Sequence, residues 1–276
     1  MQPASRAALA AARDKLESRI GSADGADLDR LGEDLGAVAA VLDEQPVIRR
    51  HLADPAVHQQ ARRKLVEALF AGKLSPLSLE VLADVVASRW SQPRDLIGGV
   101  EELARQALLA LAERDDSLDD VEDELFRFGR ILVAQPRLAA LLGDATAPAT
   151  RRVELLETVL AGRTRPVTSR LLEQAVRSPR GRPLAEIVEQ LVDRAAARRQ
   201  QSVGYVTAAS PLNAEQEQRL TDALKAIYRR PISLKIEVDP AVLGGLVIRV
   251  GDEVIDGSVA ARLDQARQWM TGGMAR

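Results

Sequence analysis

The feature that most constrains the fold of this chain is an internal repeat. Sliding the sequence by 90 residues aligns residues 35–93 with residues 125–183 without a gap, and 16 of the 59 aligned positions are identical. Chance similarity between two stretches rich in alanine and leucine would not align prolines and glycines, so we expect the two segments to share one fold. The matches include Gln45-Pro46 with Gln135-Pro136, Asp54 with Asp144, Ala71-Gly72 with Ala161-Gly162, Pro76 with Pro166, Ser88 with Ser178, and Pro93 with Pro183.

Apolar residues recur at helical spacing throughout the repeated region. Leu35, Val38 and Leu42 fall on one helix face, and glycines and prolines divide such stripes into helices of ordinary length. Asp54-Pro55 and Ser75-Pro76 each place a side-chain acceptor before a proline, which predicts two helix starts. A long helix around residues 100–114 is expected to end a first bundle and open a second.

The pattern changes after residue 200, where strands and a hairpin are predicted. Apolar residues alternate along 203–207 and strictly along 232–238, as in half-buried strands. Asn213 and Gln216 resemble a capping box before a helix. Two further strands, 246–250 and 253–255, flank Gly251-Asp252, a two-residue hairpin turn. Ser258 is expected to cap a final helix over 259–270.

These patterns predict a mainly α fold, with two tandem helical bundles followed by a small α+β C-terminal module. We expect the first bundle over residues 1–112 and the second over 100–201, sharing one helix. The module is expected over 202–276.

The composition and the missing motifs disfavour a nucleic-acid-binding, metal-binding or catalytic site. Acidic and basic residues nearly cancel, with a net charge of -2 over 276 residues, so no nucleic-acid partner is expected. There is no cysteine, and the two histidines, His51 and His58, are interpreted as surface residues. The chain lacks the glycine-rich phosphate loops and the G-x-S-x-G elbow of hydrolases. We therefore predict no catalytic, cofactor-binding or metal-binding residue.

The segment from Glu237 to Ser258 closely resembles the C-terminal signature of the delta subunit of F-type ATP synthases, called in mitochondria the oligomycin-sensitivity-conferring protein. Two glycines suit a backbone bend there, and other residues would adopt it at a cost of roughly 1 to 2 kcal/mol. The positions that carry the resemblance are Asp239, Pro240, Gly244, Gly245, Gly251, Asp252, Asp256, Gly257 and Ser258.

The resemblance implies a non-catalytic part of the stator, or peripheral stalk, of the F1Fo ATP synthase. In that family the helical bundle holds N-terminal helices of alpha subunits, and the C-terminal module grips the b-subunit stalk. The protein would then resist rotational torque during proton-driven ATP synthesis. It would lie at the cytoplasmic face of a bacterial plasma membrane, and would contact the membrane only through the b subunit.

The chain departs from the usual family pattern because it has two helical bundles where most members have one. By its position the second bundle corresponds to the usual one, so a groove for the alpha-subunit helix is expected between its first and fifth helices. The sequence leaves open which bundle holds that helix and what the extra bundle does. A free-standing helical scaffold that recruits unrelated partners is the alternative. The groove is expected at Leu103, Ala107, Leu111, Val167, Leu171 and Ala175.

Overall fold

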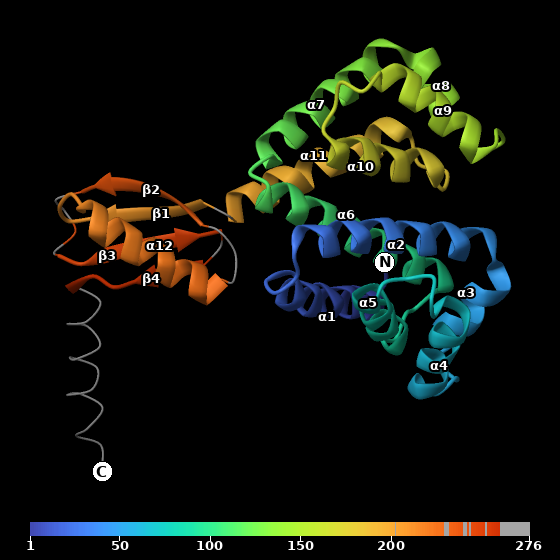
Figure 1. The fold of residues 1–276 in the computed structure, drawn as a ribbon, viewed down its shortest axis with the longest axis horizontal. Coiled ribbons are helices and arrows are strands. Elements are labelled where there is room, and N and C mark those ends of the chain that lie inside the picture. The colour runs from blue at the N-terminus through green and yellow to red at the C-terminus, as the bar shows by residue number, and fades with distance from the viewer. Residues whose placement is uncertain (202, 229–231, 240–241, 243, 252, 260–276) are drawn as a thin grey trace. The chain divides into compact units, whose positions relative to one another are not determined.

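The computed structural model of the protein is mainly helical in its described residues and carries a small sheet in its C-terminal part, as the sequence predicts (Figure 1). It describes residues 1–201, 203–228, 232–239, 242, 244–251 and 253–259. The chain divides into two compact units, Met1–Ala195 and Ala196–Arg276, and the boundary falls within one helix. We call them the helical unit and the C-terminal unit.

The described helices of the helical unit follow one another with short connections. They are α1 (Pro3–Ile20), α2 (Gly25–Glu44), α3 (Pro46–Ala53), α4 (Gln59–Phe70), α5 (Pro76–Ala87), α6 (Pro93–Arg114), α7 (Leu118–Ala134), α8 (Pro136–Gly143), α9 (Ala149–Leu160), α10 (Pro166–Arg177) and α11 (Leu184–Gln201).

The helix boundaries reproduce the sequence repeat. Helices α8, α9 and α10 each begin 90 residues after α3, α4 and α5. Helix α6 begins at Pro93, midway between Pro3 at the start of α1 and Pro183 just before α11. Proline suits a first helical turn because its missing N–H would have no partner there. Helix α6 is thus the counterpart of both α1 and α11, which confirms two tandem bundles.

One predicted helix start is wrong. Helix α4 begins at Gln59, five residues after Asp54. His58 is its N-cap, because the Nδ1 atom of His58 accepts a hydrogen bond from the Gln60 N–H at 3.3 Å. The carboxylate of Asp54 instead accepts from the N–H of Ala56 at 2.9 Å, which closes a turn after α3. Asp-Pro fits both a helix start and a turn, so the local pattern did not decide. At Ser75-Pro76 the prediction is confirmed, because Ser75 caps α5.

Helix α6 is the centre of the helical unit. Fifteen of its 22 residues are buried, whereas a surface helix buries only one face. The reason is that α6 packs against helices from both bundles. These are α1, α2, α3 and α5, which precede it in the chain, and α7 and α10, which follow it. The predicted long helix is therefore confirmed, and it starts earlier than expected.

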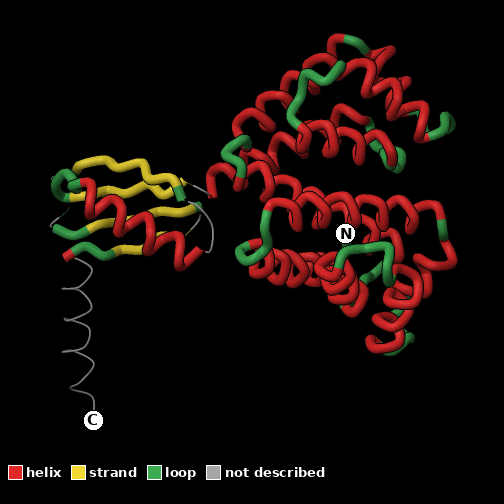
Figure 2. Tube along the Cα trace, in the orientation of Figure 1, coloured by secondary structure: helices red, strands yellow, loops and turns green. Residues whose placement is uncertain are grey.

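The described residues of the C-terminal unit include a four-stranded sheet with α12 along one face (Figure 2). Strands β1 and β2 pair in parallel and are joined through α12, whereas β1–β3 and β3–β4 are antiparallel, in the order β2-β1-β3-β4. Val206, Leu224, Ile232, Ile248 and Val250 form the core. The elements are β1 (Val203–Ala208), α12 (Ala214–Tyr228), β2 (Ser233–Val238), β3 (Leu246–Val250) and β4 (Glu253–Asp256).

The local predictions for this unit are largely confirmed. Asn213 and Gln216 form the capping box, with reciprocal hydrogen bonds of 2.9 and 2.8 Å. Gly251 opens the β3–β4 hairpin with a φ of 58°. Asp252 and nearly all of the predicted final helix over 259–270 lie outside the described residues.

Candidate functional site

The structure places the six predicted groove residues on two neighbouring helices. Leu103, Ala107 and Leu111 lie on α6, and these side chains are at most 9% exposed. Val167, Leu171 and Ala175 lie on α10 and are at most 5% exposed. Helices α6 and α10 pack against each other, so the expected pair is brought together. The six side chains belong to the apolar core of the unit, and their role toward a partner stays a prediction.

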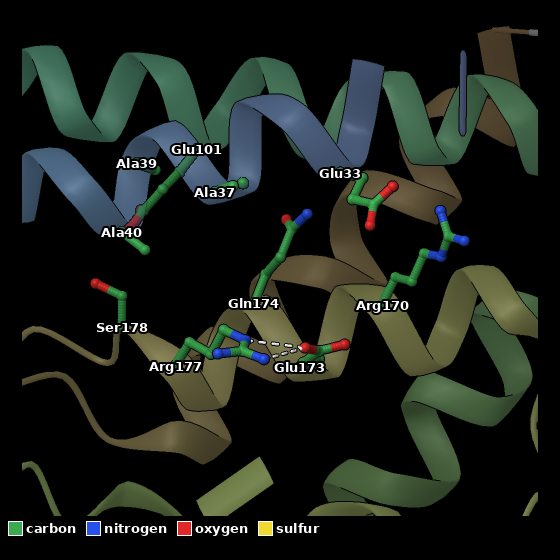
Figure 3. Close-up of a pocket in the computed structure, with 11 residues that line it drawn as sticks. Glu33, Ala37, Ala39, Ala40, Glu101, Arg170, Glu173, Gln174, Arg177 and Ser178 are labelled. Carbon is green, nitrogen blue, oxygen red and sulfur yellow. Dashed lines mark hydrogen bonds and ion pairs between the residues drawn. The ribbon is translucent and has the colours of Figure 1, made fainter. Parts of the chain in front are cut away.

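An open cleft lies beside these residues, between α2 and α10 (Figure 3). Its volume is about 590 Å³. Helix α2 contributes mostly small side chains, which leave the space between the helices, and α10 contributes long polar ones. The lining residues are Glu33, Gly36, Ala37, Ala39 and Ala40 of α2, Glu101 of α6, Arg170, Glu173, Gln174 and Arg177 of α10, and Ser178.

Polar contacts join the two walls of the cleft. The Nε2 atom of Gln174 donates to the main-chain oxygen of Gly32 at 3.0 Å, and Ser178 Oγ donates to Asp43 at 3.0 Å. Arg170 forms an ion pair with Asp29 at one end. These bonds hold α10 against α2 at both ends and leave the cleft open between them.

The three carboxylates that line the cleft all pair with arginines. Glu33 lies 3.4 Å from Arg30, and Glu173 lies 2.7 Å from Arg177, a pair drawn in Figure 3. Glu101 pairs with Arg180. These ion pairs give the cleft a lining of alternating charges, which suits polar contacts with a partner.

A buried charge cluster on α6 lies behind the cleft. Glu102 is 5% exposed and accepts from Arg13 of α1 at 2.7 Å and from Arg194 of α11 at 2.8 Å. Burial alone would raise the pKa of Glu102, but the hydrogen bond from Arg194 and the charges of Arg194, Arg13 and Arg105 outweigh it and hold the pKa below its usual value. Glu102 thereby ties the first and last helices of the two bundles to their shared helix.

Sequence reasoning missed this cluster and one other feature, a pair of buried arginines. Arg62 and Arg152 occupy equivalent repeat positions, and their identity at the 90-residue offset was a usable signal. For Glu102 the signal was weaker. Its repeat counterparts, Ala12 and Val192, are apolar, so a charge at that position is specific to the shared helix.

The glycines of the C-terminal signature allow backbone conformations and close approaches that a side chain would prevent. Gly244 and Gly245 adopt φ angles of 80° and 86°, which L side chains rarely tolerate. A Cβ at Gly245 would collide with the main chain of Gly257 and Ser258. The N–H of Gly257 donates to Leu246 O at 2.8 Å, and this bond holds the segment at Gly257 close to the start of β3.

Of the described acidic signature residues, Asp256 closes a turn with its carboxylate, and Asp239 extends the β1–β2 pairing with its main chain. Asp256 accepts from the N–H of Ser258 at 2.9 Å, and hydrogen bonding from the side chain of Ser258, together with this N–H, lowers the pKa of the Asp256 carboxyl. The N–H of Asp239 donates to Ala208 O at 2.9 Å. Pro240 and Asp252 lie outside the described residues.

The part of the chain that the structure describes contains neither a cluster of metal ligands nor a membrane-spanning helix. No group of three or more His, Asp or Glu side chains there could hold a metal ion. No described helix is long and apolar enough to cross a membrane. His51 and His58 are both exposed.

Fold and site together define a two-bundle helical protein with a small α+β module, built around one shared helix. The family model "ATP synthase delta (OSCP) subunit" matches residues 19–91 and 105–270. The chain belongs to this family. It is 45% identical to the ATP synthase subunit delta of Streptomyces griseus over 99% of this chain and 100% of that one.

Two further relatives support the assignment. Identity to the ATP synthase subunit delta of Streptomyces avermitilis is 47%, over 97% of each chain. Identity to the ATP synthase subunit b-delta of Mycobacterium sp. (strain KMS) is 42%, over 96% of this chain and 60% of that longer one.

Proposed function

We propose that this chain connects the F1 head of an ATP synthase to the b-subunit stalk, with the helical unit binding alpha-subunit N-terminal helices and the C-terminal unit binding the b subunit. A delta (OSCP) subunit is the peripheral-stalk component that links these parts. The observation that carries the proposal is the family match over residues 19–91 and 105–270. The domain division, residues 1–112, 100–201 and 202–276, is part of the proposal.

The alpha-subunit helix is proposed to bind in the cleft between α2 and α10, on the same helix α10 that carries half of the predicted groove residues. Ala37 and Ala40 present small side chains to the cleft, and an entering helix could bury apolar side chains against them. The polar side chains of α10 that line the cleft would form hydrogen bonds with the entering helix. The proposed site would share helices α6 and α10 with the six buried residues predicted for the groove.

The architecture suits a mechanical role. The two bundles share α6, so no flexible linker separates them, and the Glu102 cluster ties three helices across that junction. A connector that resists torque must transmit force without extending. We propose that the chain is non-catalytic, and that it lies at the cytoplasmic face of a bacterial plasma membrane and contacts the membrane only through the b subunit.

Two titrations test the proposal. The purified full-length chain is mixed with a peptide of the alpha-subunit N-terminus and, separately, with the soluble part of the b subunit, and binding is followed by calorimetry. We expect saturable binding of both. Binding of neither, together with recovery of unrelated proteins on affinity purification, would favour the free-standing scaffold instead.

The Gly245→Val variant tests whether the C-terminal unit makes the b-subunit contact. The new side chain would collide with Gly257 and Ser258, so we expect affinity for the b subunit to fall by at least about tenfold. Peptide binding and the helical far-UV signal should persist. Lys225→Ala, at an exposed position of α12, is the control. Wild-type b-subunit affinity in Gly245→Val would show that this bend does not support the contact.

A further inference from the structure

Helix α7 carries a second face of large exposed side chains. Phe126 is 55% exposed and Val133 is 71% exposed, and the exposed Arg130 lies between them. Spacings of four and three residues place them on one side of a helix. A single exposed apolar residue is ordinary, whereas two large ones in line suggest a contact surface. The core side of α7 is a separate stripe, formed by Leu118, Val121, Leu125, Phe128 and Leu132.

The internal repeat shows what covers the equivalent face elsewhere in this chain. The counterparts of Phe126, Arg130 and Val133 on α2 are Gly36, Ala40 and Asp43. That side of α2 faces α10: a Cβ at Gly36 would touch Gln174, and Ser178 donates to Asp43. The α2 face therefore holds a helix. The exposure of Phe126 and Val133 shows that no described residue covers the α7 face in the same way.

The charges on α7 indicate what kind of helix would fit. Asp120 near its start pairs with Arg165, and Arg127 pairs with Asp123. Within the described residues no carboxylate pairs with Arg130. The unneutralised charge beside Val133 is thus positive. A matching helix needs apolar side chains opposite Phe126 and Val133 and a carboxylate opposite Arg130.

We propose that Phe126, Arg130 and Val133 form a second docking face, the α7 face, which binds an acidic amphipathic helix of the F1 head. The proposal rests on the proposed function, because it takes the helical unit to be the part that binds the head. It adds a contact distinct from the α2–α10 cleft. With two separate contacts on one rigid unit, the head would be held against rotation about either helix.

A cysteine-labelling experiment tests the α7 face directly, because the chain has no cysteine of its own. The Val133→Cys variant is reacted with a maleimide, alone and with saturating purified F1 that lacks this subunit. We expect labelling to slow by at least about tenfold in the complex, as for a side chain buried at an interface. The Ile227→Cys variant, at a position that is 63% exposed on α12, should react equally in both conditions.

An affinity measurement provides the second test. The full-length double variant Phe126→Ser/Arg130→Glu should bind F1 at least about tenfold more weakly, and the loss should shrink at high salt because one contact is ionic. Val47→Ser/Arg50→Glu, which changes exposed positions of α3 in the same way, is the matched control and should bind normally.

The outcomes separate the two levels of the proposal. If the wild-type chain does not bind F1, the proposed function fails. If it binds F1 while the Val133→Cys variant stays reactive in the complex and the double variant keeps wild-type affinity, the α7 face is not a docking site, although the proposed function stands. Protection of the Val133→Cys thiol by the soluble b subunit alone, or by raising the concentration of the chain itself, would also overturn the assignment to the head.

Discussion

Two buried arginines, one in each repeat, donate hydrogen bonds to the carbonyls at the end of a helix. Arg62 donates to the carbonyls of Val86, Ala87 and Ser88 at the end of α5, at 2.9 Å for Ser88. Arg152 donates in the same way to Val176 and Arg177 at the end of α10. The last carbonyls of a helix have no partner within it, and a guanidinium offers five donors. Burial lowers the pKa of both arginines, and Asp54 and Asp144 oppose that shift.

Replacing one of these arginines should destabilise the helical unit. Arg62→Met keeps the apolar stem but leaves the three carbonyls without their donor, so we expect the free energy of unfolding to fall by about 2 kcal/mol. Urea unfolding followed by circular dichroism measures the change. Lys64→Met, an exposed position on the same helix, is the control and should change stability by less than about 0.5 kcal/mol. Equal effects of both variants would contradict this role for Arg62.

At the scale of one element, α6 shows how packing overrides helix propensity. Gly98 and Gly99 are neighbours within it, and alanine would favour the helix at either position. The ring of Trp90 lies against Gly99, is 2% exposed and is fixed by a hydrogen bond from its indole N–H to Val85 O at 2.9 Å. Gly98 meets only the end of the Met1 side chain and, farther off, that of Arg180.

The two glycines should therefore respond oppositely to alanine. Gly99→Ala would push into a buried ring that cannot move freely, so we expect a loss of about 1 to 3 kcal/mol. Gly98→Ala should stabilise by about 0.5 to 1 kcal/mol, because a flexible side chain can give way. Thermal or urea unfolding of both variants measures this. A stabilising Gly99→Ala would mean that Trp90 is not held as described.

At the scale of the whole helical unit, Glu102 joins α1, α6 and α11. Its partners, Arg13 and Arg194, lie 89 and 92 residues away along the chain. Removing the carboxylate would leave buried or half-buried arginines without their counter-charge. That cost is larger than for an exposed ion pair.

We expect Glu102→Gln to lower the free energy of unfolding by about 3 kcal/mol at neutral pH. The folded pKa of Glu102 lies below its ordinary value of 4.5, so the carboxylate stabilises the fold fully above that pH and loses this effect as the pH falls through the folded pKa. The difference between wild type and variant should therefore be constant near pH 7 and shrink below about pH 4.5. Urea unfolding across this range measures it.

The exposed substitution Glu67→Gln is the control for this pH series, because it removes a carboxylate at the surface of the same unit. It should change the free energy of unfolding by less than about 0.5 kcal/mol at each pH. A Glu102→Gln deficit that stays constant down to about pH 3 would show that the carboxylate charge is not what stabilises the junction.

Most helices and strands, the duplication and the family could be predicted from the order of the amino acids alone. Helical spacing, alternation and turn residues act over a few neighbours, so Ser75 before α5 and Asn213 with Gln216 were readable locally. The Glu237–Ser258 segment pointed to the family because its glycines must sit at fixed backbone positions.

Which residues face the core, the cleft or the surface depends on how distant segments pack. An apolar stripe such as Val167, Leu171 and Ala175 has the same pattern whether it packs inside the chain or awaits a partner, and here it is buried. Glu102 meets Arg13 and Arg194 only because three helices distant in sequence pack together. Such contacts depend on how the two bundles share α6, and no short stretch of sequence encodes that arrangement.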